Sequence, residues 1–101
     1  MDAETNALQD AIRNLHGCDS TWVESVPVRE TFKGRVVWEG AVEVIDLHGH
    51  DSATRCYAWL HPVGDSGRRK LYAVLHVPPV DSPIKAVRAS IVRDFKKANP
   101  N

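Results

Sequence analysis

Long apolar runs are missing from this 101-residue sequence, since no stretch approaches the roughly 18 consecutive apolar residues that a membrane span needs. The segment from Met1 to Thr5 also lacks the basic start and apolar core of a signal peptide. We therefore expect a small cytoplasmic protein of bacterial type with no membrane contact. The length fits a single globular domain over residues 1–101 and is too short for two independent cores.

Cysteine is scarce, with only Cys18 and Cys56 present. One bridge between them is possible, but a chain of this size with 43% hydrophobic residues can fold without it. Two reduced thiols are therefore expected. Cys56 falls on the apolar side of a predicted strand, where a cysteine behaves as a small hydrophobic residue rather than a catalytic thiol.

Motifs of known catalytic chemistry are absent as well. The sequence contains no GxSxG, HExxH, phosphate-binding loop or dinucleotide fingerprint. His61 or His76 near Glu43 would suit a general base, but no nucleophile or oxyanion stabiliser accompanies them. We expect neither an enzyme nor a cofactor.

Four potential metal ligands occur within six residues: Asp46, His48, His50 and Asp51. Imidazole and carboxylate groups can bind zinc and other divalent metals. Here they surround Gly49 in a turn, where aspartate and glycine are common for backbone reasons. A solvated turn is the preferred interpretation, and no metal site is predicted.

Two changes of apolar spacing divide the chain into helices and strands. Helical spacing over residues 3–16 ends at Gly17, a suitable C-cap, and a second helix starts at Ser82 and Pro83. Between the helices, apolar residues recur at every second position. This alternation predicts strands at about 21–32, 36–47, 54–61 and 70–77, and Pro27 marks the first of them as an edge strand. This is an α+β fold in the order α-β-β-β-β-α, a four-stranded antiparallel meander with both helices packed on one face.

The segment 55–61 alternates large amphipathic side chains with small apolar ones, which a strand separates onto two faces. Trp59 is expected opposite Tyr72, and Val44 opposite Cys56. One sheet face then becomes aliphatic and is covered by the helices. The other is predicted to be an open binding surface of Arg55, Tyr57, Trp59, His61, Tyr72, His76 and Glu43.

Three exposed aromatic side chains would form a patch as large as the largest on most soluble monomers. Mutual support of the aromatics across neighbouring strands would explain them without a ligand. The leading functional hypothesis is a non-enzymatic binding or assembly domain that uses the open face for homodimerisation or for a partner protein. A small-ligand or metal-binding protein is a third possibility.

The net charge of zero conceals an uneven distribution. Residues 1–51 contain ten acidic and four basic residues, a net charge of −6, and residues 52–101 contain three acidic and nine basic residues, a net charge of +6. The alternative hypothesis is therefore an RNA or single-stranded DNA binding module, with bases stacked on Tyr57 and Trp59. Its phosphate contacts would be Arg68, Arg69, Lys70, Lys85 and Arg88.

The order of the predicted elements is similar to that of double-stranded RNA-binding domains. A four-stranded sheet followed by a helix also resembles domains that bind single strands on sheet aromatics. The sequence departs from the first family in having four strands rather than three, and in lacking its dense lysine cluster at residues 82–85. A zero net charge is also unlike a dedicated phosphate binder.

Overall fold

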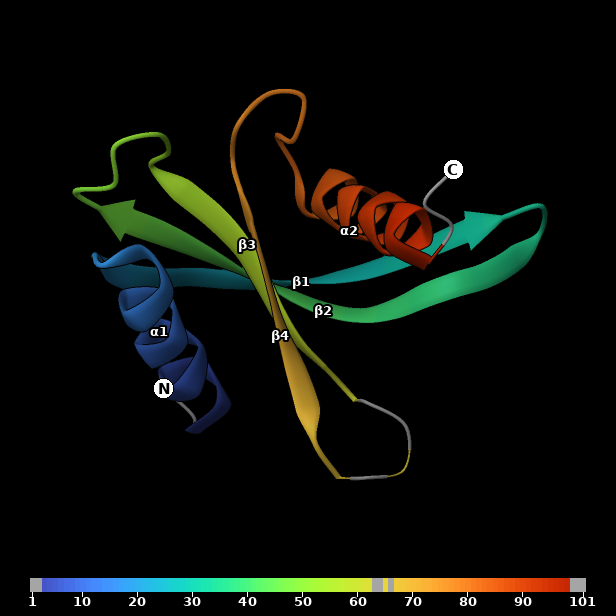
Figure 1. Ribbon diagram of the computed structural model, residues 1–101, viewed down its shortest axis with the longest axis horizontal. Coiled ribbons are helices and arrows are strands. Elements are labelled where there is room, and N and C mark those ends of the chain that lie inside the picture. Colours follow the sequence, from blue (N-terminus) through green and yellow to red (C-terminus); the bar gives the residue numbers. More distant parts are fainter. Residues whose placement is uncertain (1–2, 63–64, 66, 99–101) are drawn as a thin grey trace.

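The computed structural model describes residues 3–62, 65 and 67–98 (Figure 1). Its elements are α1 (Ala3–His16), β1 (Asp19–Phe32), β2 (Arg35–His48), β3 (Arg55–Pro62), β4 (Arg69–Leu75) and α2 (Pro83–Ala98). The strands form one antiparallel sheet in the order β1-β2-β3-β4. The predicted element order and antiparallel meander are confirmed. No helix in this part of the chain is long and apolar enough to cross a membrane.

The residues that predicted turns and helix caps in the sequence form those turns and caps in the structure. Gly17 ends α1 with a φ of 67°, a conformation that glycine adopts without steric cost. Lys33 and Gly34 join β1 to β2 with φ of 51° and 78°, the two positive values of a tight hairpin turn. Ser82 caps α2, since its hydroxyl accepts the Lys85 backbone N–H at 3.4 Å.

Helix α1 covers one face of the sheet. Leu8 and Ile12 are buried there against alternate residues of β3, including Cys56 and Ala58. Burial of this small apolar side of β3 agrees with the sequence prediction. The buried members of this cluster are Leu8, Ile12, Cys18, Ile45, Leu47, Ala53, Cys56 and Ala58.

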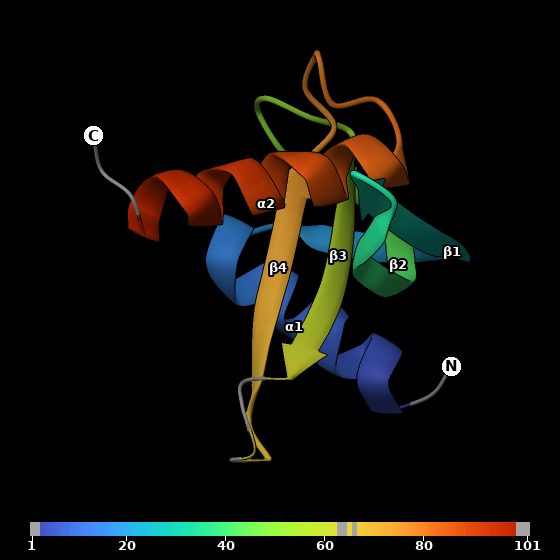
Figure 2. The same cartoon turned by 90° about the vertical axis from the view of Figure 1, so that its right-hand side faces the viewer.

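Helix α2 covers the opposite face, so the prediction that both helices pack on one face is wrong. Ala86 and Val87 of α2 are fully buried against Tyr57 and Trp59, the residues of β3 that alternate with Cys56 and Ala58. Figure 2 shows α2 in front of β3 and β4, with α1 behind them. The sheet is a central layer with one helix on each side.

A one-residue shift in the pairing of β2 with β3 explains the difference. Val44 pairs with Tyr57, and Ile45 with Cys56, whereas the sequence reading placed Val44 opposite Cys56. A shift of one residue exchanges the two faces of a strand. Val42 and Val44 therefore lie on the face of Tyr57 and Trp59 and make it apolar enough to bury a helix.

An irregularity in β1 between Trp22 and Glu24 has a similar effect along a single strand. Trp22 packs against the core beneath α1, whereas Val26 and Val28 pack in the core beneath α2. In an uninterrupted strand these three side chains, at even-numbered positions, would share one face. The extra residue at Val23 lets β1 contribute to both cores.

Candidate functional site

The predicted aromatic surface is a covered layer beneath α2. Trp59 is only 2% exposed, and its ring stacks on Tyr72 with centroids 5.4 Å apart and an interplanar angle of 6°. Trp38 of β2 contacts Trp59 edge-on, at 5.6 Å between centroids. Tyr57 is likewise 2% exposed. The prediction of an open aromatic face is therefore wrong, because α2 of the same chain covers this face.

The half-buried Tyr72 lies at the border of this layer. Its hydroxyl donates to Asp94 of α2 at 2.8 Å, and burial followed by this bond raises the pKa of Tyr72. The exposed His61 ring contacts Tyr72 edge-on at 6.2 Å. The Lys70 ammonium lies 4.9 Å from the Tyr72 centroid. Among the three predicted aromatics, Tyr72 alone remains partly accessible.

Glu43 does not belong to this surface. Glu43 and Ile45 lie on the opposite face of β2, because Glu43 pairs with Ala58 and Ile45 with Cys56, rather than with the residues of the aromatic face. Its carboxylate accepts a hydrogen bond from the Trp22 indole N–H at 3.0 Å and another from Ser25. The predicted proximity of Glu43 to His61 or His76 is therefore wrong.

Two of the predicted residues, Arg55 and His76, meet in a hollow where β2 ends, β3 begins and β4 ends. We call it the polar pocket, with a volume of about 450 Å³. Arg55 donates from Nε to Asp46 Oδ1 at 2.8 Å, and this bond is the main cause of its raised pKa. The lining residues are Asp46, Leu47, His48, Thr54, Arg55 and His76.

Each imidazole of the polar pocket is held through one ring nitrogen. His76 Nδ1 lies 2.6 Å from the Tyr57 hydroxyl, and His48 Nε2 lies 2.6 Å from the Thr21 hydroxyl. Burial raises the pKa of Tyr57, so its phenol is neutral near pH 7 and can donate to His76. None of the described histidine, cysteine and acidic side chains gathers in a group of three or more that could hold a metal ion.

The turn between β2 and β3 uses its second histidine differently. His50 Nδ1 accepts the backbone N–H groups of Ser52 and Ala53, at 3.0 and 3.2 Å. Its ring also contacts His16 at the end of α1, with centroids 5.2 Å apart. His50 thus organises the turn, and His48 alone of the two lines the polar pocket.

A second hollow, of about 610 Å³, runs along the outer side of α2. We call it the α2 groove. Four basic side chains line it together with the half-exposed Val92, which is 51% exposed. The lining residues are Pro79, Val80, Lys85, Arg88, Ala89, Val92, Arg93 and Lys96.

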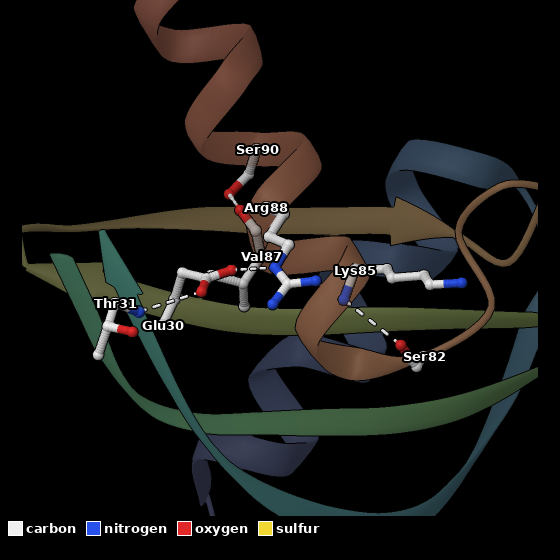
Figure 3. A network of polar contacts seen from close by, with 7 residues as sticks. All are labelled: Glu30, Thr31, Ser82, Lys85, Val87, Arg88 and Ser90. Carbon is white, nitrogen blue, oxygen red and sulfur yellow. Dashed lines mark hydrogen bonds and ion pairs between the residues drawn. The ribbon is translucent and has the colours of Figure 1, made fainter. Parts of the chain in front are cut away.

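One of these four cations, Arg88, also anchors α2 to β1 (Figure 3). The Arg88 guanidinium binds the carboxylate of Glu30 on β1, which also accepts the Thr31 backbone N–H at 3.0 Å. Hydrogen bonding from Arg88 holds the pKa of Glu30 below its ordinary value, although burial opposes this shift. Lys85 pairs with Asp81 at 3.0 Å and lowers the pKa of that carboxyl.

The residues of the nucleic-acid hypothesis fall into two separate groups. Arg68, Arg69 and Lys70 lie where β4 begins, whereas Lys85 and Arg88 lie on the first turns of α2, beyond the other end of β4 (Figures 1 and 2). The five predicted phosphate contacts therefore do not form one continuous basic surface.

Sequence reasoning missed three contributors to these sites. Arg93 and Lys96 received no site role from the sequence, yet their four-residue spacing from Ala89 and Val92 was the available sign of a shared helix side. Asp46 was assigned to a solvated turn, and only the register with β3 reveals that it faces Arg55.

Comparisons of this chain with protein-family models, curated proteins and solved structures found no match.

Proposed function

We propose that this chain is a cytoplasmic, non-enzymatic binding domain that docks an acidic, amphipathic segment of another protein in the α2 groove. The observation that carries the proposal is the composition of the groove. Its four charged residues are all basic, and they surround the exposed apolar side chain of Val92. Such a combination suits a ligand that presents apolar and acidic residues together.

The size and location of the groove support a peptide ligand. The hollow, of about 610 Å³, is open along α2, so it suits a ligand that lies along the helix rather than an enclosed small molecule. An amphipathic helix could place its apolar stripe against Val80, Ala89 and Val92. Its acidic flanks would then face the cations at the rim.

The charge of the groove is only partly compensated by the protein itself. Lys85 and Arg88 pair with Asp81 and Glu30. Arg93 and Lys96 form no ion pair within the described part of the chain, and both are exposed. They are the cations most available to an acidic partner, and we expect them to contribute most to its attraction.

Nucleic acid is a less suitable occupant. Tyr57 and Trp59, which were to stack on bases, are each 2% exposed. The basic segment 68–70 lies at the start of β4, whereas α2 begins after the other end of that strand, so the segment does not extend the basic surface of Lys85 and Arg88. The apolar side chain of Val92 would gain no favourable contact from a phosphate backbone.

Binding of designed peptides tests the proposal. The probe is a fluorescein-labelled amphipathic helix with leucine at i, i+3, i+4 and i+7 and glutamate elsewhere, measured by anisotropy. A lysine version of the same peptide and a single-stranded oligonucleotide serve as competing probes. Saturable binding of the acidic peptide alone is expected, weakening as salt rises.

Paired variants locate the binding surface. Arg93→Gln/Lys96→Gln should weaken binding about tenfold, since two charges at a partly exposed rim contribute about 1.4 kcal/mol together. Lys33→Asn/Arg35→Gln removes the same charge from the β1–β2 turn, and asparagine tolerates the positive φ at residue 33. This control should bind normally. Equal binding of both peptides, or of the oligonucleotide alone, would contradict the proposal.

A further inference from the structure

We propose that the polar pocket is a separate binding site for a small oxyanion, a carboxylate or a phosphate. It lies at the meeting of three strand ends and shares no lining residue with the α2 groove. The inference therefore does not rest on the proposed function.

The backbone places the polar side chains of the pocket together. Asp46 and Arg55 pair directly across β2 and β3. The His76 backbone N–H donates to the Arg55 carbonyl at 2.8 Å and continues the ladder beyond β4. Three side chains from distant positions in the sequence thus stand in a row, on strands that fix their positions.

Arg55 is oriented for a planar ligand. Its Nε–H is occupied by Asp46, at 2.8 Å, and this bond directs the guanidinium toward β2. The terminal nitrogens carry the remaining four N–H donors. The Arg55 side chain is 39% exposed, so a ligand entering the pocket can reach it. The negative charge of Asp46 is already balanced by this same guanidinium.

The two imidazoles present further donors. In the tautomer in which the neutral Tyr57 phenol donates to His76 Nδ1, the proton of the uncharged ring lies on Nε2. At His48, the Thr21 hydroxyl is hydrogen-bonded to Nε2, so Nδ1 is the ring nitrogen that does not bond to Thr21. Within the described residues, neither of these second nitrogens has a hydrogen-bond partner. The four terminal N–H groups of Arg55 are donors in every state, and each second imidazole nitrogen is a donor in the tautomer that carries its proton or when the ring is protonated. Oxygen atoms of an anion are suitable acceptors for these groups.

The charges around the pocket favour a small ligand over a large polyanion. Asp81 acts electrostatically on His76 and is itself held by Lys85. Glu24 acts on Arg55 from β1. These carboxylates oppose any anion, and an extended polyanion most of all, so the ligand proposed is a single small group held by direct bonds in a volume of about 450 Å³.

Titration followed by NMR tests the site directly. Imidazole signals are recorded while sodium phosphate, sulfate or acetate is added at constant ionic strength. Saturable shifts of His48 and His76 are expected, with His16 and His61 unchanged. Acetate against phosphate and sulfate distinguishes a carboxylate from a tetrahedral oxyanion, and saturation by either one supports the proposal. Linear shifts of all histidines with each salt would overturn it.

Variants provide the second criterion. Arg55→Lys retains the charge and loses the planar fork, so affinity should fall about five- to tenfold. His48 is exposed, so His48→Gln tests the site without disturbing the core, and affinity should again fall. Arg93→Gln/Lys96→Gln should bind normally. If that double variant abolishes the shifts and His48→Gln leaves affinity unchanged, the anion binds elsewhere and the proposal is wrong.

Discussion

The indole of Trp38 lies over the backbone of Gly40, two residues along the same strand. A Cβ atom at position 40 would stand 3.1 Å from Cη2 and 3.3 Å from Cζ2 of that ring. The indole has little room to retreat, because it also contacts Trp59 edge-on. Gly40 thus permits a close approach of the Trp38 ring to the backbone, and it supports the aromatic layer beneath α2.

Gly40→Ala should therefore destabilise the protein, by about 1–3 kcal/mol as in other overpacked sites. In a Trp38→Ala background the same change should be neutral or stabilising, because alanine loses less backbone entropy than glycine on folding. Urea unfolding of the four proteins gives the coupling free energy. Equal effects of Gly40→Ala in both backgrounds would show that the ring does not restrict position 40.

The ion pair between Glu30 and Arg88 predicts a stability that depends on acid pH. The Glu30 side chain is 11% exposed, and its pKa is lowered mainly by the hydrogen bond from Arg88. A lowered folded-state pKa means that the stabilisation is complete above the ordinary value of 4.5 and is lost as pH falls through the folded value. Urea unfolding from pH 7 to pH 3 should show this decline.

Glu30→Gln should cost about 1–3 kcal/mol at pH 7, because it leaves a mostly buried bond weakened, and the decline in acid should become shallower. The matched control is Glu39→Gln, which removes the exposed pair with Arg29, where the side chains are 56% and 66% exposed. That change should cost less than about 1 kcal/mol. A larger loss from Glu39→Gln than from Glu30→Gln would contradict the anchoring role.

The extent of each element could be predicted from the sequence, whereas the assignment of faces could not. Helical spacing and the Gly17 and Ser82 signals are local, and so is the alternation in β3. The pairing of β3 with β4 was also predicted correctly, with Trp59 opposite Tyr72. The turn between β2 and β3 depends on the ring of His50, which accepts two backbone N–H groups that sequence reasoning had no means to count.

The β2–β3 turn sets the register of β2 with β3, and this register determines where the candidate sites lie. A shift of one residue placed Val44 beside Tyr57 and moved Glu43 to the other face. Once both faces were apolar, α2 had a surface to cover, and the outer side of α2 became the exposed one. The sequence therefore identified Arg55 and His76 correctly as neighbours, but not the pocket that they share with Asp46 and His48.

Cys56 should be unreactive in the folded protein. It is fully buried, and burial raises the pKa of its thiol to about 12, so almost no thiolate is present at pH 8. The variant Cys18→Ser isolates this thiol for reaction with a disulfide reagent. Modification should be at least about 100-fold faster in urea than in buffer, since it requires unfolding. Rapid modification without denaturant would contradict the burial of Cys56 beneath α1.

His16 should make the protein less stable as the pH falls below neutral. Its Nε2 is buried without a hydrogen-bond partner among the described residues, and its ring contacts His50. Burial first, and then His50, lower the pKa of His16 below its ordinary value of 6.5. The unfolded chain therefore binds a proton more readily, and the free energy of unfolding should fall as pH decreases from 6.5 toward the folded-state value.

The His16 effect begins near pH 6.5 and the Glu30 effect near pH 4.5, so the two declines start at different points of one pH series. His16→Gln should flatten the profile between pH 7 and pH 5 and leave the steeper decline at lower pH intact. The exposed His61 provides the control, since His61→Gln should keep the wild-type profile. If His61→Gln flattens the profile and His16→Gln does not, the neutral pH sensitivity arises at the border of the aromatic layer rather than at the junction of α1 with the β2–β3 turn.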